Sequence, residues 1–107
     1  MQNVTAPELA AWLADTSRTP PLLLDVREAR EYEICHIENA TLIPMNTVPA
    51  RLAELDPDAE IVCICHHGGR SMQVAAFLER NGFAKVTNLT GGVHAWSQQV
   101  NPAMPTY

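Results

Sequence analysis

The chain of 107 residues lacks several features that mark specialised classes of protein. It has no run of lysine or arginine and a net charge of −5, so neither nucleic acid nor an anionic membrane surface is an expected partner. No apolar run approaches the roughly 20 residues that a membrane span needs. The first residues form neither the basic nor the apolar part of a signal peptide. We therefore expect a cytoplasmic protein with no membrane partner.

Cysteine is also scarce, and its three residues are an odd number that gives no disulfide framework. This agrees with a reducing compartment. Hydrophobic residues make up 47% of the chain and charged residues 18%, as in globular domains. The length suits one domain, so we expect residues 1–107 to fold as a unit. Residues 100–107 contain two prolines and are expected to form a loosely ordered tail.

Short apolar runs alternate with helical patterns along the chain. The apolar runs predict buried strands at residues 22–26, 40–43, 61–65 and 86–89. Helical patterns occupy residues 5–14, 28–33, 46–55, 71–80 and 93–99. This alternation predicts an α/β fold in which helices cover both faces of a mostly parallel sheet. In such folds the site lies at the carboxyl ends of the strands, so the end of the first run and the 90–92 turn should meet there.

One predicted strand leads directly into a reactive side chain. The apolar run over 61–65 ends on Cys65, a segment with two glycines follows, and a helical pattern opens at Ser71. A tight loop before a helix N-terminus can point backbone N–H groups at the sulfur, and glycine allows the backbone angles required. We expect the Cys65 thiol to be shifted toward thiolate and to act as a nucleophile.

Three segments together resemble one protein family. Residues 65–70, Cys-His-His-Gly-Gly-Arg, resemble the active-site loop of the rhodanese-type sulfurtransferases. Residues 22–32, with 36–37 and 43–44 behind them, are similar to the family's amino-terminal signature, and residues 86–96 resemble the carboxy-terminal one. The resemblance covers nearly the whole chain in the right order. It implies a rhodanese-like fold with about five strands in the sheet.

The resemblance implies that the protein transfers a sulfane sulfur. The Cys65 thiolate attacks the outer sulfur of thiosulfate or a related small anionic donor, and Cys65 then carries a persulfide. Cyanide or a thiol acceptor, either a small molecule or a thioredoxin-like protein, removes that sulfur. This chemistry needs no metal or organic cofactor. The loop residues expected to bind the donor and stabilise the persulfide are His66, His67, Gly68, Gly69, Arg70 and Ser71.

Charged residues outside the loop are expected to support it. By resemblance, Asp25 and Arg27 orient the rim through hydrogen bonds and ion pairs. Arg70 has two interpretations, which remain open. It docks the sulfonate end of the donor, or it pairs with a carboxylate such as Asp25 or Glu28.

The other cysteines and the histidines have less distinctive surroundings. Cys63 shares a side of the sheet with Cys65 and is expected to pack in the core. Cys35 stands where the family usually has glycine, and we interpret it as a tolerated substitution. A role as a resolving thiol is the alternative for both. Adjacent histidines in a tight loop should point apart, and His66 and His67 have no third ligand at a matching spacing, so no metal site is predicted.

Two other functions compete with enzymatic sulfur transfer. A persulfide carrier for a protein partner needs the same persulfide, so the sequence leaves both interpretations open. A Cys-dependent phosphatase or arsenate reductase uses a Cys-x5-Arg loop, whereas Cys65 to Arg70 is Cys-x4-Arg. The smaller ring suits sulfur better than a tetrahedral phosphate, and no Asp general acid is evident.

Overall fold

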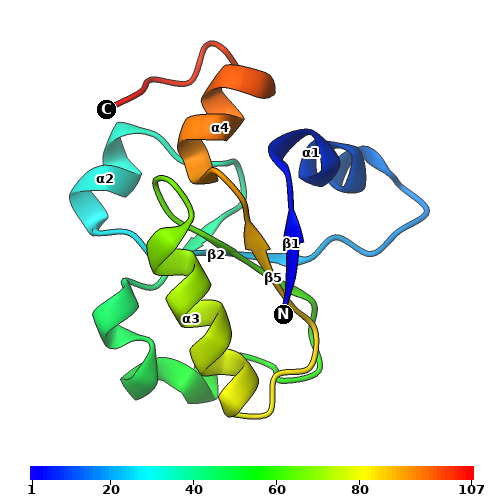
Figure 1. Cartoon of the computed structure of the whole chain (residues 1–107), viewed down its shortest axis with the longest axis vertical. Helices are drawn as coiled ribbons and strands as arrows, with labels where there is room; N and C mark the ends of the chain where they lie inside the picture. The colour runs from blue at the N-terminus through cyan, green and yellow to red at the C-terminus, as the bar shows by residue number, and fades with distance from the viewer.

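A five-stranded sheet forms the centre of the computed structural model, which describes residues 1–107 (Figure 1). Its strands are β1 (Gln2–Val4), β2 (Leu22–Asp25), β3 (Thr41–Leu42), β4 (Ile61–Ile64) and β5 (Val86–Leu89). They lie in the order β1-β5-β4-β2-β3, and every neighbouring pair is parallel. The predicted α/β class and parallel sheet are confirmed. The carboxyl end of the central strand β4 therefore opens at the rim where a site is expected.

Helices cover both faces of this sheet (Figure 1). The α-helices are α1 (Ala6–Ala14), α2 (Ala29–Ile34), α3 (Gly69–Arg80) and α4 (Gly92–Gln99), and two 3-10 helices are η1 (Met45–Thr47) and η2 (Pro49–Glu54). α1 and α4 pack together on one face, whereas α3 and the two 3-10 helices cover the other. None of these helices combines the length and apolar character that crossing a bilayer requires.

The alternation of side chains along each strand divides the core into two layers. Leu23, Val62 and Leu89 lie in the layer under α1 and α4. Cys63 and Cys65 lie in the layer under α3. Residues two apart on a strand point to the same face, which is why both thiols share one side of the sheet, as predicted.

Two elements differ from the sequence prediction. β1 was not predicted as a strand, because it is short and largely exposed and is defined by its pairing with β5. The expected helix over 46–55 is replaced by η1 and η2. The Thr47 hydroxyl donates to the Pro44 carbonyl and caps no following helix. Pro49 has no N–H to donate, which favours two short tight segments over one α-helix.

The tail that the sequence predicts to be loosely ordered contacts the rest of the protein. Met104 is buried, and its carbonyl accepts a hydrogen bond from the Ser97 hydroxyl of α4. From there the chain returns toward α2 (Figure 1), which brings Tyr107 to the rim of the sheet.

Candidate active site

Cys65 directly follows β4 and lies inside the loop that leads to α3. Its side chain is 1% exposed. The Gly68 N–H donates a hydrogen bond to the Cys65 Sγ at 3.0 Å, and the Ser71 Oγ lies 3.3 Å from the same sulfur. Of the predicted loop residues, these two contact the sulfur. One backbone donor and one hydroxyl oxygen therefore face the Cys65 sulfur.

The two loop glycines have different structural roles. Gly68 has a φ of +111°, in the left-handed region, and a Cβ there would approach the Gly91 nitrogen at 3.3 Å. Gly69 begins α3 without a positive φ, and a Cβ there would meet nothing within 4 Å. The expected need for glycine backbone angles is thus confirmed for Gly68 and wrong for Gly69.

Ser71 is positioned by Asn88, which the sequence does not predict to be part of the site. Its hydroxyl lies 2.5 Å from the Oδ1 of Asn88 on β5, and both side chains are buried. A hydroxyl carries a single proton, and Ser71 donates its proton to Asn88. This bond holds the Ser71 oxygen in place beside Cys65. A polar residue within the apolar run over 86–89 was the available signal for this role.

The start of α4 holds the Cys65 loop from the other side. The Val93 N–H donates to the Cys65 carbonyl at 2.9 Å, and the His94 N–H donates to the His66 carbonyl at 3.1 Å. Gly92 has a φ of +59°, and a Cβ there would clash with both of these carbonyl oxygens. The predicted meeting of the 90–92 turn with the Cys65 rim is confirmed, and it depends on close backbone approach.

Asp25, the last residue of β2, and Arg27 form a fully buried ion pair. The Arg27 Nε donates to Asp25 at 2.9 Å, and its Nη2 donates to Asp25 at 2.6 Å and to the Cys35 carbonyl at 2.7 Å. Burial by itself lowers the pKa of Arg27, but hydrogen bonds to Asp25 and Tyr107 outweigh it and raise the pKa. The pair anchors the end of β2 to the carboxyl end of α2.

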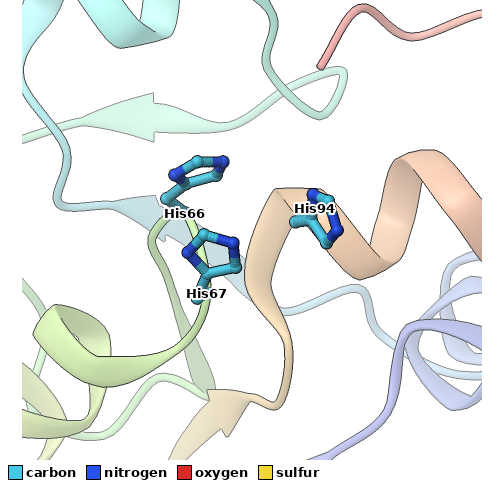
Figure 2. A group of neighbouring side chains, drawn as sticks. All are labelled: His66, His67 and His94. Atoms are coloured by element: carbon cyan, nitrogen blue, oxygen red, sulfur yellow. The ribbon is translucent and has the colours of Figure 1, made fainter. Parts of the chain in front are cut away.

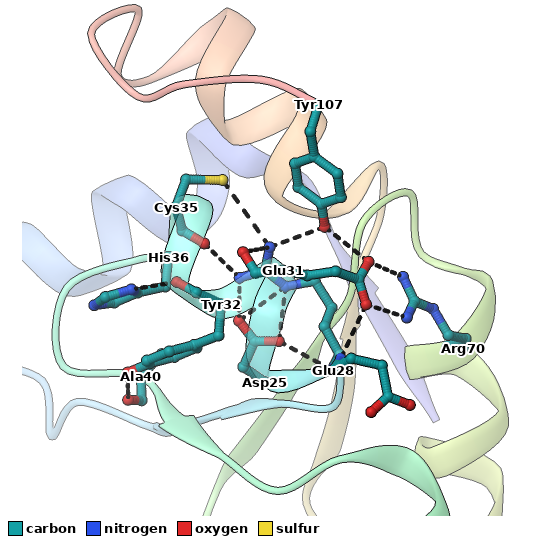
Figure 3. Close-up of polar contacts among 10 residues, drawn as sticks. Asp25, Glu28, Glu31, Tyr32, Cys35, His36, Ala40, Arg70 and Tyr107 are labelled. Carbon is teal, nitrogen blue, oxygen red and sulfur yellow. Dashed lines mark hydrogen bonds and ion pairs between the residues drawn. The ribbon is translucent and has the colours of Figure 1, made fainter.

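Arg70 pairs with a carboxylate that was not among those predicted. Its guanidinium donates to both oxygens of Glu31, at 2.8 and 2.9 Å (Figure 3). Asp25 is already engaged by Arg27, and Glu31 lies one turn beyond Glu28 on α2, which presents it to α3. Hydrogen bonding to Glu31 raises the pKa of Arg70. Hydrogen bonding from Arg70 also lowers the pKa of Glu31 to about 2.

Tyr107 closes this network from the tail. Its hydroxyl accepts a hydrogen bond from Arg27 at 2.9 Å and donates one to Glu31 at 3.0 Å (Figure 3). Its ring stacks on His66, with centroids 3.9 Å apart and planes 10° from parallel. Burial raises the pKa of Tyr107. No pattern in the sequence marked this residue, because its position results from the path of the tail.

Three histidines form a cluster (Figure 2). The sequence predicts instead that His66 and His67 point apart and that no third ligand accompanies them. The His66 and His67 rings lie with centroids 3.9 Å apart, so adjacent side chains do not point apart. His94 supplies a third ring, 5.0 Å from His67 and 6.0 Å from His66. Burial and the neighbouring His67 and His94 lower the pKa of His66. His36 lies elsewhere, exposed and stacked on Tyr32.

The remaining cysteines are both buried. Cys63 lies in the core as predicted, and burial, with a contribution from Cys65, raises its pKa to about 12. Cys35 ends α2 with a φ of −163°, extended backbone that any residue adopts, which explains why a side chain is tolerated there. Its sulfur lies 4.0 Å from the Arg27 Nη1.

The fold and the site together define an α/β protein with a buried cysteine at the end of a central parallel strand, enclosed by a loop donor and a helix start. Residues 5–99 match the Rhodanese-like domain, and the chain belongs to this family. A protein from Allochromatium vinosum named "Sulfurtransferase" is 34% identical over 102 residues, covering 95% of this chain and 94% of its own.

Two further relatives differ in length. The chloroplastic "Rhodanese-like/PpiC domain-containing protein 12" of Arabidopsis thaliana is 40% identical over 89 residues, 79% of this chain, but the match spans 30% of that protein. The crystal structure of a rhodanese-like domain protein from Staphylococcus aureus superimposes with a TM-score of 0.85 at 33% identity, covering 100% of this chain and 99% of the other.

Proposed function

We propose that the protein is a sulfurtransferase that carries a sulfane sulfur as a persulfide on Cys65. The observation that carries this proposal is the contact of the Cys65 Sγ with the Gly68 N–H. In the first step the Cys65 thiolate attacks the outer sulfur of thiosulfate or a related donor. A sulfur–sulfur bond forms to Cys65, the bond inside thiosulfate breaks, and its electron pair leaves with sulfite.

The second step returns the enzyme to its starting state. A thiolate of a small molecule or a thioredoxin-like protein, or cyanide, attacks the terminal sulfur of the persulfide. The electron pair of the broken bond returns to Cys65 as thiolate, so no external oxidant or reductant is consumed. The Gly68 N–H and the start of α3 stabilise the anionic sulfur, whereas the Ser71 hydroxyl donates its one proton to Asn88.

Several observations favour sulfur over phosphoryl chemistry in this loop. Asp25 at the end of β2 is held in a buried ion pair with Arg27, so it is not available as a general acid. The loop also has one residue fewer between Cys65 and Arg70 than a Cys-x5-Arg loop. The Allochromatium relative, which this chain matches over nearly its full length, is named a sulfurtransferase. We place the activity in the cytoplasm.

Arg70 is proposed to guide the donor while it remains paired with Glu31. The pair keeps Arg70 beside the loop, and its side chain remains 33% exposed. A guanidinium offers five N–H donors, and two of them are used by Glu31, which leaves donors for a sulfonate oxygen.

Intact-mass measurement after brief exposure to thiosulfate tests the proposal. Wild type should gain the mass of one sulfur atom, cyanide should remove it, and Cys65→Ser should gain none. Cys35→Ala is the matched control and should still gain the sulfur, because the Cys35 sulfur faces Arg27 and does not contact the Cys65 sulfur. Sulfur on Cys65→Ser, or none on wild type with thiosulfate, mercaptopyruvate or a protein persulfide, would refute the assignment.

The acceptor decides between an enzyme and a carrier. For an enzyme we expect repeated turnover with cyanide or a small thiol, following two-step ping-pong kinetics. Slow turnover with small acceptors but fast transfer to a protein thiol would assign the protein as a persulfide carrier.

A further inference from the structure

Three imidazoles lie together at the Cys65 loop, those of His66 and His67 in the loop and that of His94 in α4, and none of them contacts the Cys65 sulfur. Each of His66, His67 and His94 offers a ring nitrogen, and the three nitrogens lie within 4.8 Å of one another (Figure 2). Tetrahedral Zn²⁺ with Zn–N distances near 2.05 Å needs nitrogens about 3.4 Å apart. The most widely separated pair therefore has to close by at most about 1.4 Å, a displacement that rotation about side-chain torsions can supply.

Two nitrogens of this cluster have no partner within the protein. The Nε2 of His66 and the Nδ1 of His94 are buried from solvent, and neither makes a hydrogen bond. Buried polar atoms are normally satisfied, so each exception calls for a ligand or another explanation. A cation bound to the imidazole cluster would supply such a ligand.

Backbone hydrogen bonds hold the loop that carries His66 against the start of α4, which carries His94. The His94 N–H donates to the His66 carbonyl at 3.1 Å, and the Val93 N–H donates to the Cys65 carbonyl at 2.9 Å. These bonds fix the first turn of α4 against the loop. Tyr107 stacks on one face of the His66 ring and leaves the ring edge, where the nitrogens lie, uncovered by stacking. Preorganised ligands reduce the cost of forming a metal site.

The charge around the cluster does not exclude a cation. The two nearby guanidinium groups, Arg27 and Arg70, are each paired with a carboxylate, Asp25 and Glu31. The start of α4 contributes a partial positive charge, which argues for a ligand set of neutral imidazoles and a metal that imidazole binds strongly.

We propose that His66, His67 and His94 bind one borderline divalent transition-metal ion, of which Zn²⁺ is the test case. Three imidazoles provide three of four tetrahedral positions, and the fourth remains open to water or a small anion. The site is separate from the chemistry of Cys65, so it exists whether or not the protein transfers sulfur. It would place a divalent charge at the entrance to the Cys65 loop.

Titration calorimetry with ZnCl₂ tests this site in the absence of any sulfur donor. Wild type and Cys65→Ser should each bind one equivalent with equal affinity. His94→Ala and His67→Ala should each weaken binding at least about tenfold, because each removes one of three ligands. His67 is exposed, so its variant should fold normally. His36→Ala is the matched control and should bind like wild type, since His36 stacks on Tyr32 outside the cluster.

Substitution of Co²⁺ identifies the ligand type. We expect visible absorption bands of a tetrahedral nitrogen-ligated ion in wild type and Cys65→Ser, and their loss in His94→Ala. A thiolate-to-cobalt band that disappears in Cys65→Ser would overturn the proposal, because it would place the ion on Cys65. The proposal would also be overturned if wild type bound no metal, or if His67→Ala and His94→Ala bound it as tightly as wild type.

Discussion

The Arg70 guanidinium of α3 and the Glu31 carboxylate of α2 form a two-point ion pair, with donor–acceptor distances of 2.8 and 2.9 Å. Tyr107 donates to the same carboxylate. Three segments that are far apart in sequence are therefore joined at one side chain next to the Cys65 loop. Paired geometry of this kind fixes both position and orientation of the guanidinium.

This pair makes stability depend on pH. The pKa of Glu31 is about 2 in the folded protein, against an ordinary value of 4.5, so the unfolded chain takes up the proton first as pH falls. The contribution is complete above pH 4.5 and is lost as pH falls toward 2. Urea unfolding measured across this pH range should show that the free energy of unfolding falls less steeply in Glu31→Gln than in wild type. Glu33→Gln on the same helix is the control, and a profile flattened equally by it would contradict the assignment.

Gly92 and Gly69 should respond oppositely to alanine. Gly92→Ala places a Cβ against two carbonyl oxygens at a φ of +59°. We expect a loss of about 2–4 kcal/mol in the free energy of unfolding. Gly69→Ala meets nothing within 4 Å at ordinary helical angles and should be neutral or stabilising by up to about 1 kcal/mol. Denaturant titration of both variants measures this difference, and equal losses would refute the close-approach explanation.

Removing the Ser71 hydroxyl should leave a buried acceptor unpaired. In Ser71→Ala the Asn88 Oδ1 loses its 2.5 Å partner, which should cost about 1–3 kcal/mol of stability. Because the two groups share one hydrogen bond, Ser71→Ala with Asn88→Ala should cost less than the two single changes added together, by at least about 0.5 kcal/mol. Thermodynamic additivity in this double-mutant cycle would show that the contact contributes nothing.

The buried ion pair should cost far more to break than an exposed one. Arg27→Met leaves the Asp25 charge buried without a partner, and we expect a loss of roughly 3–5 kcal/mol. Arg27→Met combined with Asp25→Leu should recover part of that loss, since no lone charge remains. Arg51→Met breaks the exposed pair with Glu54 and should cost far less stability, because solvent screens both charges of that pair. Chemical unfolding of the three variants measures these losses. A loss for Arg51→Met as large as that for Arg27→Met would contradict the expected order.

The part of the site that the sequence predicts is the part encoded by neighbouring residues. An apolar run that ends on Cys65, a glycine loop and a helical pattern from Ser71 lie within one short stretch, and the structure contains that strand, loop and helix. The α/β class follows for the same reason, because alternation of short apolar runs and helical patterns is local information. β1 is different, since two exposed residues and the half-buried Val4 become a strand only by pairing with β5.

The contacts that the sequence does not predict join residues from distant segments. Twelve acidic residues are available to Arg70, and nothing in their order distinguishes Glu31 from Glu28. The choice depends on how α2 is turned toward α3. His94 likewise joins the loop histidines because α4 starts against the Cys65 carbonyl, a packing result that residue spacing does not encode.

The position of Tyr107 determines where any polypeptide attached after it would start. Its ring lies on His66, at the carboxyl ends of the parallel strands, whereas Met1 precedes β1 at the opposite rim and its amine pairs with Glu79. An affinity tag or a fused domain joined after Tyr107 would therefore emerge beside the loop that holds Cys65 and compete with incoming molecules for space. The same addition before Met1 would leave that entrance open.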